Sequence, residues 1–516
     1  MTTQPKLNEN ALFAGLVVAL GLIAVFLVST YVFNSVNPIA SISGVVGSLL
    51  LICGVVNPNR MLFAMVPITL YLDSVKRMLV FSGETSLDNV TSVLSIAPLT
   101  VAGILIGCVF RRIFRRKRGT TAERIAIVAA LAAYVAFGGL ETFSEGNLLF
   151  ALRTIANTTV YFLLGWAVLH CFKTKEDVER YLRFSLLVGV PVALYGVWQY
   201  LMGLNDFEIA YLRSGLSITA SNLDDVRPRP FSTLSSAHAY SIVMTFMLAV
   251  SVHFAMKTKV GEARWKWGAV VSIYAMGLLF SLSRSATVAG LLMLGFSVLF
   301  RSAKGVSLAY LISGILLAIF VIFAESIQDN MDKLQSLLPM NSDWQQQAFR
   351  LGTFTDRLQS YRNVLGNPSS WPLLANPLSY RANEALFGEA GFTHDLFSQM
   401  ILRIGAIPVF ALIALGLFLL GHAHRAIFKL PAGKVGLRSL AARLMAIIVV
   451  YLLSQSGGSG MTVFPLNFWT TMFIGMLAVL CLQERVPPPV QEPRRTQRLP
   501  RRGEIGIALP GVPKTR

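Results

Sequence analysis

Apolar segments long enough to cross a membrane follow one another along almost the whole chain, separated by short polar loops. A helix needs about 20 residues to cross roughly 30 Å of hydrocarbon, and in lipid a continuous apolar run satisfies its backbone groups by forming a helix. The pattern predicts an all-α, polytopic membrane bundle of about 14 transmembrane helices. We expect them at residues 11–33, 38–57, 61–72 (short for a full span), 92–110, 124–140, 148–171, 181–203, 235–256, 265–282, 285–300, 306–324, 395–421, 437–454 and 463–482.

The longest polar stretch, residues 325–394, separates the eleventh predicted helix from the twelfth. It ends at Thr393-His394-Asp395, where the next apolar helix begins. A helical bundle does not need such a loop in order to fold, so we expect this one to contribute to function. One transmembrane bundle then covers residues 1–482, and residues 483–516 form a basic, proline-rich tail that we expect to be disordered.

Basic residues gather in alternate loops and predict the orientation of the bundle, because Lys and Arg are enriched on the cytoplasmic side. The strongest cluster, residues 111–118, places both termini in the cytoplasm. The segment 205–233, the turn Ser281–Ser285 and the loop 325–394 then lie on the outer side. The predicted outer loop 73–91 carries Lys76 and Arg77 against this trend.

Composition supports a membrane protein and argues against other classes. The chain has 516 residues, of which 54% are hydrophobic and 14% charged, and its mean hydropathy is +0.60. Its net charge of +19 sits in short loops, so topology explains it better than nucleic-acid binding. The four cysteines are far apart in sequence and lack C-x-x-C spacing, which favours neither a zinc site nor a disulfide framework. They are Cys53, Cys108, Cys171 and Cys481.

Arginines on the predicted outer side are the main candidates for chemistry. Guanidinium groups bind phosphate oxygens in pairs and stay charged, so several of them near one rim suit a diphosphate. Each arginine alone is more often a solvated charge or a lipid headgroup contact, and His238 is more often a capping or packing residue. No carboxylate cluster has metal-site spacing, so we expect no metal and no cofactor. The candidates are Arg227, Arg229, Arg284, Arg357, Arg362, Arg403, His238, Tyr361 and His394.

Four short elements occur in a fixed order within residues 180–420: Arg229-Pro230-Phe231-Ser232-Thr233, Ser283-Arg284-Ser285-Ala286, Arg357-Leu358-Gln359-Ser360-Tyr361 and Thr393-His394-Asp395, with Gly405 downstream. This order resembles the O-antigen ligase and O-antigen polymerase superfamily, which are bacterial membrane glycosyltransferases with a GT-C-like helical fold. The chain departs from the family pattern at Ser232, where glycine is common, and at Asp395, where asparagine is common. It also has more predicted spans than is usual.

The resemblance implies an enzyme of the bacterial inner membrane whose site faces the periplasm. His394 would accept a proton from an acceptor sugar hydroxyl, while Arg357 and either Arg227 or Arg229 would hold the diphosphate of an undecaprenyl-diphosphate-linked glycan. Arg284 would support that site. Arg362, Arg403, His238 and Tyr361 are further supporting candidates. The reaction would be inverting and metal-independent, because arginines could neutralise the leaving diphosphate.

Three functions remain open from the sequence. We favour a polymerase of exopolysaccharide or O-antigen repeats, and the alternative within the family is a ligase that joins glycan to a lipid A core. A polysaccharide flippase or other secondary transporter is the alternative from another class, in which polar sites lie near the membrane midplane. The expected partners are the lipid-linked donor, a glycan or lipid A core acceptor, membrane lipids and other polysaccharide assembly proteins, without nucleic acid.

Overall fold

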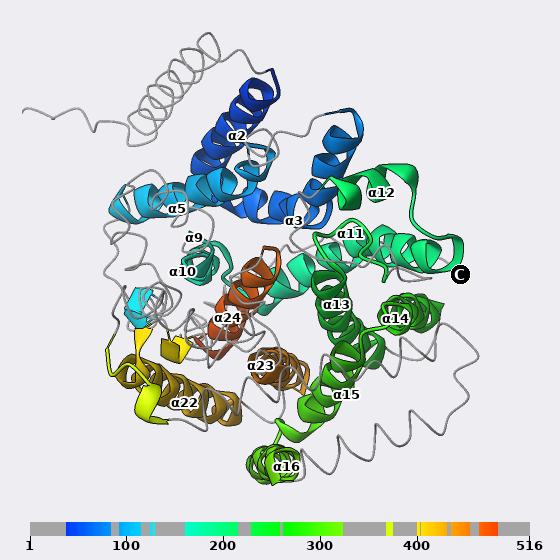
Figure 1. Ribbon diagram of the computed structural model, residues 1–516. Coiled ribbons are helices and arrows are strands. Elements are labelled where there is room, and N and C mark those ends of the chain that lie inside the picture. Colours follow the sequence, from blue (N-terminus) through cyan, green and yellow to red (C-terminus); the bar gives the residue numbers. More distant parts are fainter. Residues whose placement is uncertain are drawn as a thin grey trace, which may run out of the picture.

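The computed structural model of the chain describes residues 38–83, 92–114, 124–125, 127–128, 160–214, 229–258, 262–322, 368–374, 400–402, 404–430, 435–454 and 464–482. Within these ranges the regular structure is entirely helical (Figure 1). The all-α prediction is therefore confirmed for the described residues. The predicted span 11–33 and most of 124–140 lie outside them.

Five described helices are long and apolar enough to cross a membrane, and five shorter apolar helices accompany them. The long ones cover Ser92–Ile113, Lys175–Met202, Ala237–Lys257, Ala406–Lys429 and Gly436–Ser454. Along the chain the helices are α2 (Pro38–Val56), α3 (Pro58–Phe81), α5 (Ile96–Phe114), α9 (Val160–Phe162), α10 (Leu164–Cys171), α11 (Lys175–Met202), α12 (Asp206–Arg213), α13 (Ala237–Lys257), α14 (Glu262–Phe280), α15 (Arg284–Leu299), α16 (Ala303–Ile322), the 3₁₀ turn η2 (Pro368–Ser370), α22 (Ala406–Lys429), α23 (Val435–Ser454) and α24 (Leu466–Leu482).

Helix α3 is twice as long as the short span predicted at 61–72. It begins where the side chain of Asn57 accepts a hydrogen bond from the Arg60 backbone N–H, with Pro58 in the first turn, a position that proline favours. It continues through Lys76 and Arg77, so the prediction of an outer loop starting at residue 73 is wrong. The pattern failed because these charges are buried inside the bundle, whereas hydropathy treats every charge as a reason to end a span.

The helix predicted at 395–421 is interrupted at Gly405 and ends later, at Lys429. Gly405 has a φ of +89°, a backbone conformation that favours glycine. Its neighbours Ala406 and Ile407 donate backbone hydrogen bonds to the carbonyls of Pro372 (2.8 Å) and Leu373 (3.2 Å). The described piece of the long polar stretch, residues 368–374, is therefore bound to the first turn of α22.

Capping residues account for another shifted boundary. Helix α11 begins at Lys175 and not at 181, because Thr174 and Asp177 form a capping box that stabilises the first turn. The segment predicted as an outer loop at 205–233 contains α12, which has its own capping box between Asn205 and Glu208. Polar caps thus extend two helical segments into regions that hydropathy alone assigns to loops.

The centre of the bundle consists of α13, α23 and α24, which Figure 1 shows surrounded by the other helices. The apolar windows of α13 and α23 are 83% and 72% buried, whereas that of α22 is only 11% buried. Large apolar residues such as Leu417 and Phe418 are 63% and 67% exposed on α22. An extensive exposed apolar surface of this kind fits contact with lipid.

Helices α2 and α5 form a parallel pair through glycine contacts. A Cβ placed on Gly103 would lie 2.2 Å from the carbonyl oxygen of Leu51, and one on Gly107 would lie 2.6 Å from that of Val55. From the first contact to the second, the residue number increases by four on both helices, so the two helices run parallel. Small residues spaced four apart let helix backbones approach closely in lipid.

The helix termini lie at two opposite ends of the bundle, which we call the basic end and the far end. At the basic end, Lys257 at the end of α13 binds Glu179 near the start of α11 at 2.6 Å, and Arg443 of α23 reaches α13. At the far end, Arg77 of α3 faces Glu208 of α12. The far end is also the end from which the candidate segment Arg229–Thr233 leads into α13.

Candidate functional site

Six of the nine residues predicted for function lie outside the described residues, and three lie within them. Arg229 is half-buried just before α13, while His238 and Arg284 are exposed in the first turns of α13 and α15. Those outside are Arg227, Arg357, Tyr361, Arg362, Arg403 and His394. The roles predicted for these six therefore stay predictions.

The segment after Arg229 is held tightly against the bundle. Ser232 has a φ of +53°, in the left-handed region, and its Oγ donates a hydrogen bond to the Val192 carbonyl of α11 at 2.6 Å. Thr233 Oγ1 donates to the Leu70 carbonyl of α3 at 2.5 Å. These two hydroxyls tie the segment to α11 and to α3, which fixes the backbone that carries Arg229.

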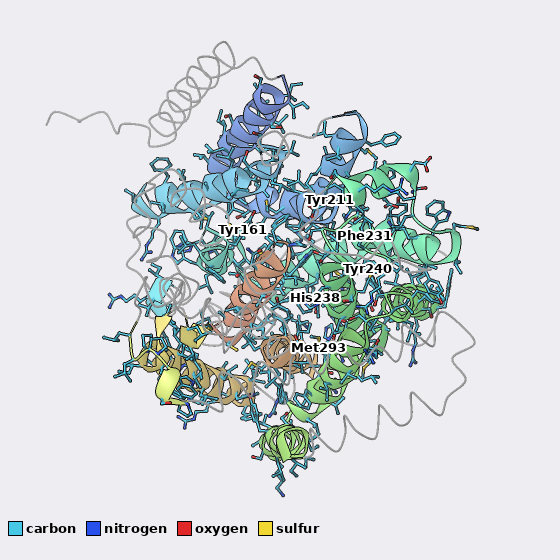
Figure 2. The ribbon with its side chains drawn as sticks, viewed as in Figure 1. Tyr161, Tyr211, Phe231, His238, Tyr240 and Met293 are labelled. Atoms are coloured by element: carbon cyan, nitrogen blue, oxygen red, sulfur yellow. The ribbon has the colours of Figure 1, made fainter. Side chains whose placement is uncertain are left out.

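Arg77 is the buried charge beneath this segment. Its side chain is fully buried, and its Nη1 donates to the carbonyl of Ser232. The guanidinium carbon lies 4.2 Å from the centre of the Phe231 ring, within the range of a cation–π contact. Figure 2 shows Phe231 and Tyr211 near α12, with His238 at the nearby start of α13.

Glu208 supplies the negative charge that faces Arg77, with 3.8 Å between Oε1 and Nη1. It also accepts hydrogen bonds from the Tyr195 hydroxyl (2.9 Å), from the Gln199 amide and from the Asn205 backbone N–H (2.9 Å). Burial raises the pKa of the Glu208 carboxyl above its usual range, although these donors and Arg77 pull it the other way. The carboxyl group is therefore fixed in position by several partners.

Gln199 joins the carboxyl group of Glu208 to the candidate segment. Its Nε2 donates to Glu208, while its Oε1 accepts from the backbone N–H groups of Phe231 (3.2 Å) and Ser232 (2.6 Å). Both the nitrogen and the oxygen of the Gln199 amide are hydrogen-bonded, which fixes the orientation of the amide. One buried network thus connects α3, α11, α12 and the segment that leads into α13.

A second cation lies beside Arg77 on α3. Lys76 Nζ is 3.2 Å from Asp73 Oδ1 and 4.9 Å from the centre of the Tyr211 ring. Its side chain is 9% exposed. The far end therefore holds two buried cations on one helical turn, with Arg229 two residues from the ring that stacks on Arg77. We call Lys76, Arg77, Tyr211, Glu208 and Arg229 the far-end site.

Arg77 keeps unused hydrogen-bonding capacity. Within the described part of the chain, neither Nε nor Nη2 has a hydrogen-bond partner. A buried guanidinium normally has its donors satisfied, because an unpaired buried donor costs about 1–3 kcal/mol. Nε and Nη2 are the groups of Arg77 with unused capacity to donate, and phosphate oxygens match the planar guanidinium fork well, although the side chain itself has no exposed surface.

His238 and Arg284 are less closely connected to the far-end site. The N-cap of α13 is Ser236, whose Oγ accepts from the Ala239 N–H, and His238 lies two residues further on, in the first turn. Thr245 of α13 contacts the Ala286 carbonyl at 3.2 Å. Ala286, two residues after Arg284, therefore lies level with a part of α13 about 10 Å of helix rise beyond His238.

Sequence reasoning predicted Arg229 but missed the other residues that build this site. Lys76 and Arg77 had one signal, since both break the positive-inside trend in the predicted orientation. Glu208, Gln199 and Tyr195 had none, because a single carboxylate or amide in a loop has no characteristic spacing. Their roles come from long-range contacts that only the folded chain reveals.

The chain was also compared with known proteins. No protein-family model matches it, and no curated protein sequence matches it.

Proposed function

We propose that this protein is a membrane glycosyltransferase that polymerises undecaprenyl-diphosphate-linked glycan units at the periplasmic face of the bacterial inner membrane. In this proposal the bundle has about 14 spans, both termini face the cytoplasm, and the far end faces the periplasm. The product is an exopolysaccharide or O-antigen chain. The basis is the resemblance of the four sequence elements to the ligase and polymerase superfamily.

The observation that carries the proposal is the contact between Arg77 and the segment Arg229–Thr233. A sequence element that resembles a diphosphate-binding segment is folded onto a buried arginine whose Nε and Nη2 have no partner in the described residues. Lys76 adds a further positive charge one residue away. This concentration of donors at one end of an apolar bundle supports a site for the diphosphate of a lipid-linked donor.

The proposed chemistry follows from this arrangement of charge. The acceptor hydroxyl attacks the anomeric carbon, the bond from that carbon to the diphosphate oxygen breaks with its electron pair, and His394 takes the hydroxyl proton. The configuration inverts because attack and departure occur on opposite faces. Arg77, Arg229 and Arg357 stabilise the charge that develops on the diphosphate, which is the task a metal performs in other transferases. We therefore expect activity to persist in EDTA.

The test is transfer activity of the purified full chain with a lipid-linked oligosaccharide as donor. We expect Arg77→Gln and Arg229→Gln to lower kcat about 10²–10³-fold, the usual effect of removing one donor to a transition-state oxyanion, and His394→Ala to abolish transfer. Arg264→Gln is the matched control, since Arg264 is an exposed arginine on α14. Full activity in folded Arg77→Gln and His394→Ala would refute the proposal.

The acceptor and the product separate this proposal from its alternatives. Longer lipid-linked chains indicate a polymerase, whereas glycan attached to a lipid A core indicates a ligase. A flippase would move the lipid-linked glycan across sealed vesicles without changing its covalent structure. Translocation without any change in chain length or attachment would replace the transferase with the transporter.

A further inference from the structure

One part of the long polar stretch carries no charge. The sequence has no Asp, Glu, Lys, Arg or His between Arg362 and Arg381. The structure describes residues 368–374 of this part, which end in Trp371-Pro372-Leu373-Leu374. Large apolar residues grouped on the surface of a protein mark a contact surface. Their surroundings therefore indicate what this part of the stretch contacts.

The end of this segment lies directly on the start of α22. Gly405 precedes the first turn of that helix, and a Cβ placed on it would lie 2.7 Å from both the Leu373 carbonyl oxygen and the Leu374 Cα. Any larger residue at this position would push the segment away from the helix. The close approach therefore depends on the absence of a side chain at Gly405.

The main chain of the segment suits surroundings without water. Trp371 donates its N–H to the Pro368 carbonyl at 3.2 Å, and Pro372 has no N–H to satisfy. The carbonyls of Pro372 and of the next residue accept the N–H groups of the first two residues of α22, at 2.8 Å and 3.2 Å. N–H groups of a first turn lack a partner within their own helix. Pairing of backbone groups inside the protein is what hydrocarbon requires of a chain.

A small apolar cluster fixes the segment against the helix. Trp371 packs on buried Ile401, Ile404 and Val409, and its ring centre lies 6.2 Å from that of Phe410. This cluster is separate from the main core of the bundle. Among the described residues, α22 and the turn before it thus hold the segment in place.

The two leucines at the end of the segment remain exposed. Leu373 is 69% exposed and Leu374 is 62% exposed. On α22, Ile407 and Phe410 are each 55% exposed, and with Leu417 they follow the spacing of one helix face. Because the Leu373 carbonyl is bound by the N–H of Ile407, the leucines extend this exposed apolar face beyond the first turn.

The length of α22 gives the depth of the segment in a membrane. Its 24 residues extend about 36 Å, slightly more than the roughly 30 Å of hydrocarbon in a bilayer. Lys429 ends the helix with a charge that suits the headgroup region. The first turn then lies at the opposite boundary, together with the segment bound to it. Trp371 fits this depth, because indole rings are enriched at membrane interfaces.

Lipid is the partner that this surface fits. Of the five candidate spans, α22 has the smallest buried share, 11%, so a bilayer that it crosses covers most of its surface. The leucines continue that surface with no charge between them and the helix. In water, the same side chains would expose apolar area unfavourably.

We infer that residues 371–374 insert into the edge of the bilayer beside α22, where Leu373 and Leu374 contact acyl chains and Trp371 lies among the headgroups. The stretch 325–394 is thereby held at the membrane surface at these residues and does not extend freely into water along its whole length. The inference rests on α22 crossing the membrane, as in the proposed function, and not on the transfer chemistry of the far-end site.

Spin labels on single cysteines test the insertion. The variants are Leu373→Cys, Leu374→Cys, Ser369→Cys and Phe418→Cys, each made in the full chain with its four native cysteines replaced by alanine and reconstituted into phosphatidylcholine bilayers. Collisions with oxygen, which dissolves in lipid, are compared with collisions with a water-soluble nickel chelate. Ser369 is the matched control in the same segment, because it is exposed and polar. Phe418 is the control for lipid on α22, since it is 67% exposed.

We expect the labels at 373 and 374 to behave as the label at 418 does, with an oxygen-to-nickel collision ratio severalfold above that at 369. A ratio at 373 and 374 equal to that at 369 would place the leucines in water and overturn the inference. Few collisions with either reagent would show that protein covers them, from this chain or from a second copy, and would overturn it as well. A label at 418 in water would remove the membrane placement of α22 too, whereas a label at 418 in lipid with 373 and 374 in water would remove the insertion alone.

Discussion

Substitutions of Ser232 test the left-handed backbone that holds the candidate segment in place. A φ of +53° carries about 1–2 kcal/mol of strain in a residue that has a Cβ, and little in glycine. The hydrogen bond from Ser232 Oγ to the Val192 carbonyl contributes about 1 kcal/mol in the other direction. In Ser232→Gly the two effects oppose each other, so we expect the free energy of unfolding to change by less than about 1 kcal/mol.

Alanine and valine at position 232 separate the backbone strain from the hydrogen bond. Ser232→Ala keeps the strained backbone and loses the hydrogen bond, so we expect a loss of about 1 kcal/mol. Ser232→Val adds a β-branched side chain in a left-handed conformation at a site with 0% exposure, so we expect a loss of about 3 kcal/mol. The predicted order of stability is glycine equal to or above serine, then alanine, then valine.

The assay is reversible unfolding in mixed detergent and SDS micelles, followed by tryptophan fluorescence. Alanine at or above glycine in stability would refute the left-handed backbone at this position. A valine variant as stable as the unmodified protein would refute the tight packing of the segment against α11. Transfer activity of the glycine variant provides the functional control, because the position of Arg229 should not change.

Three further predictions address packing and charge elsewhere. Gly103→Ala should prevent the close approach of α2 and α5 and reduce the yield of monodisperse protein, whereas Gly44→Ala, which has open space around it, should retain normal yield. The sulfur atoms of Cys108 and Cys171 lie 3.7 Å apart, so mild oxidation should join them, and a linked peptide should appear by mass spectrometry but not in Cys108→Ser. Because burial raises the pKa of Glu208, the folded state binds its proton more tightly than the unfolded state. Stability should therefore decline as pH rises above the ordinary value of 4.5, and this part of the decline should be absent in Glu208→Gln.

Hydropathy was sufficient to predict the helical class and the approximate positions of most described helices. It failed where polar residues belong to a helix interior. Lys76 and Arg77 continue α3 because Asp73, Glu208 and Phe231 accept or cover their charges. A local pattern could find Asp73, which is three residues from Lys76, but it cannot anticipate Glu208 and Phe231, which come from segments more than a hundred residues away.

The same limit applies to the candidate site and to the cysteines. Arg229 was predicted from a motif, but Arg77 beneath it was recognisable only as an exception to a charge rule. Cys108 and Cys171 are distant in sequence and their spacing favours no disulfide framework, yet α5 and α10 bring their sulfur atoms together. Spacing along the chain is informative for contacts within one helix, whereas contacts between helices depend on the packing.

The parallel pairing of α2 and α5 has a consequence for the order of assembly. Helix α3 lies between α2 and α5 in the chain, so α2 cannot meet its parallel partner until α3 and α5 have both been synthesised. At roughly 5–20 residues per second, the 39 residues between Val56 and Ile96 take several seconds to make. During that interval the surface of α2 that later receives Gly103 and Gly107 must face lipid or the insertion machinery. The nascent chain is then most vulnerable to mispairing, and a substitution at Gly103 would act first on biogenesis.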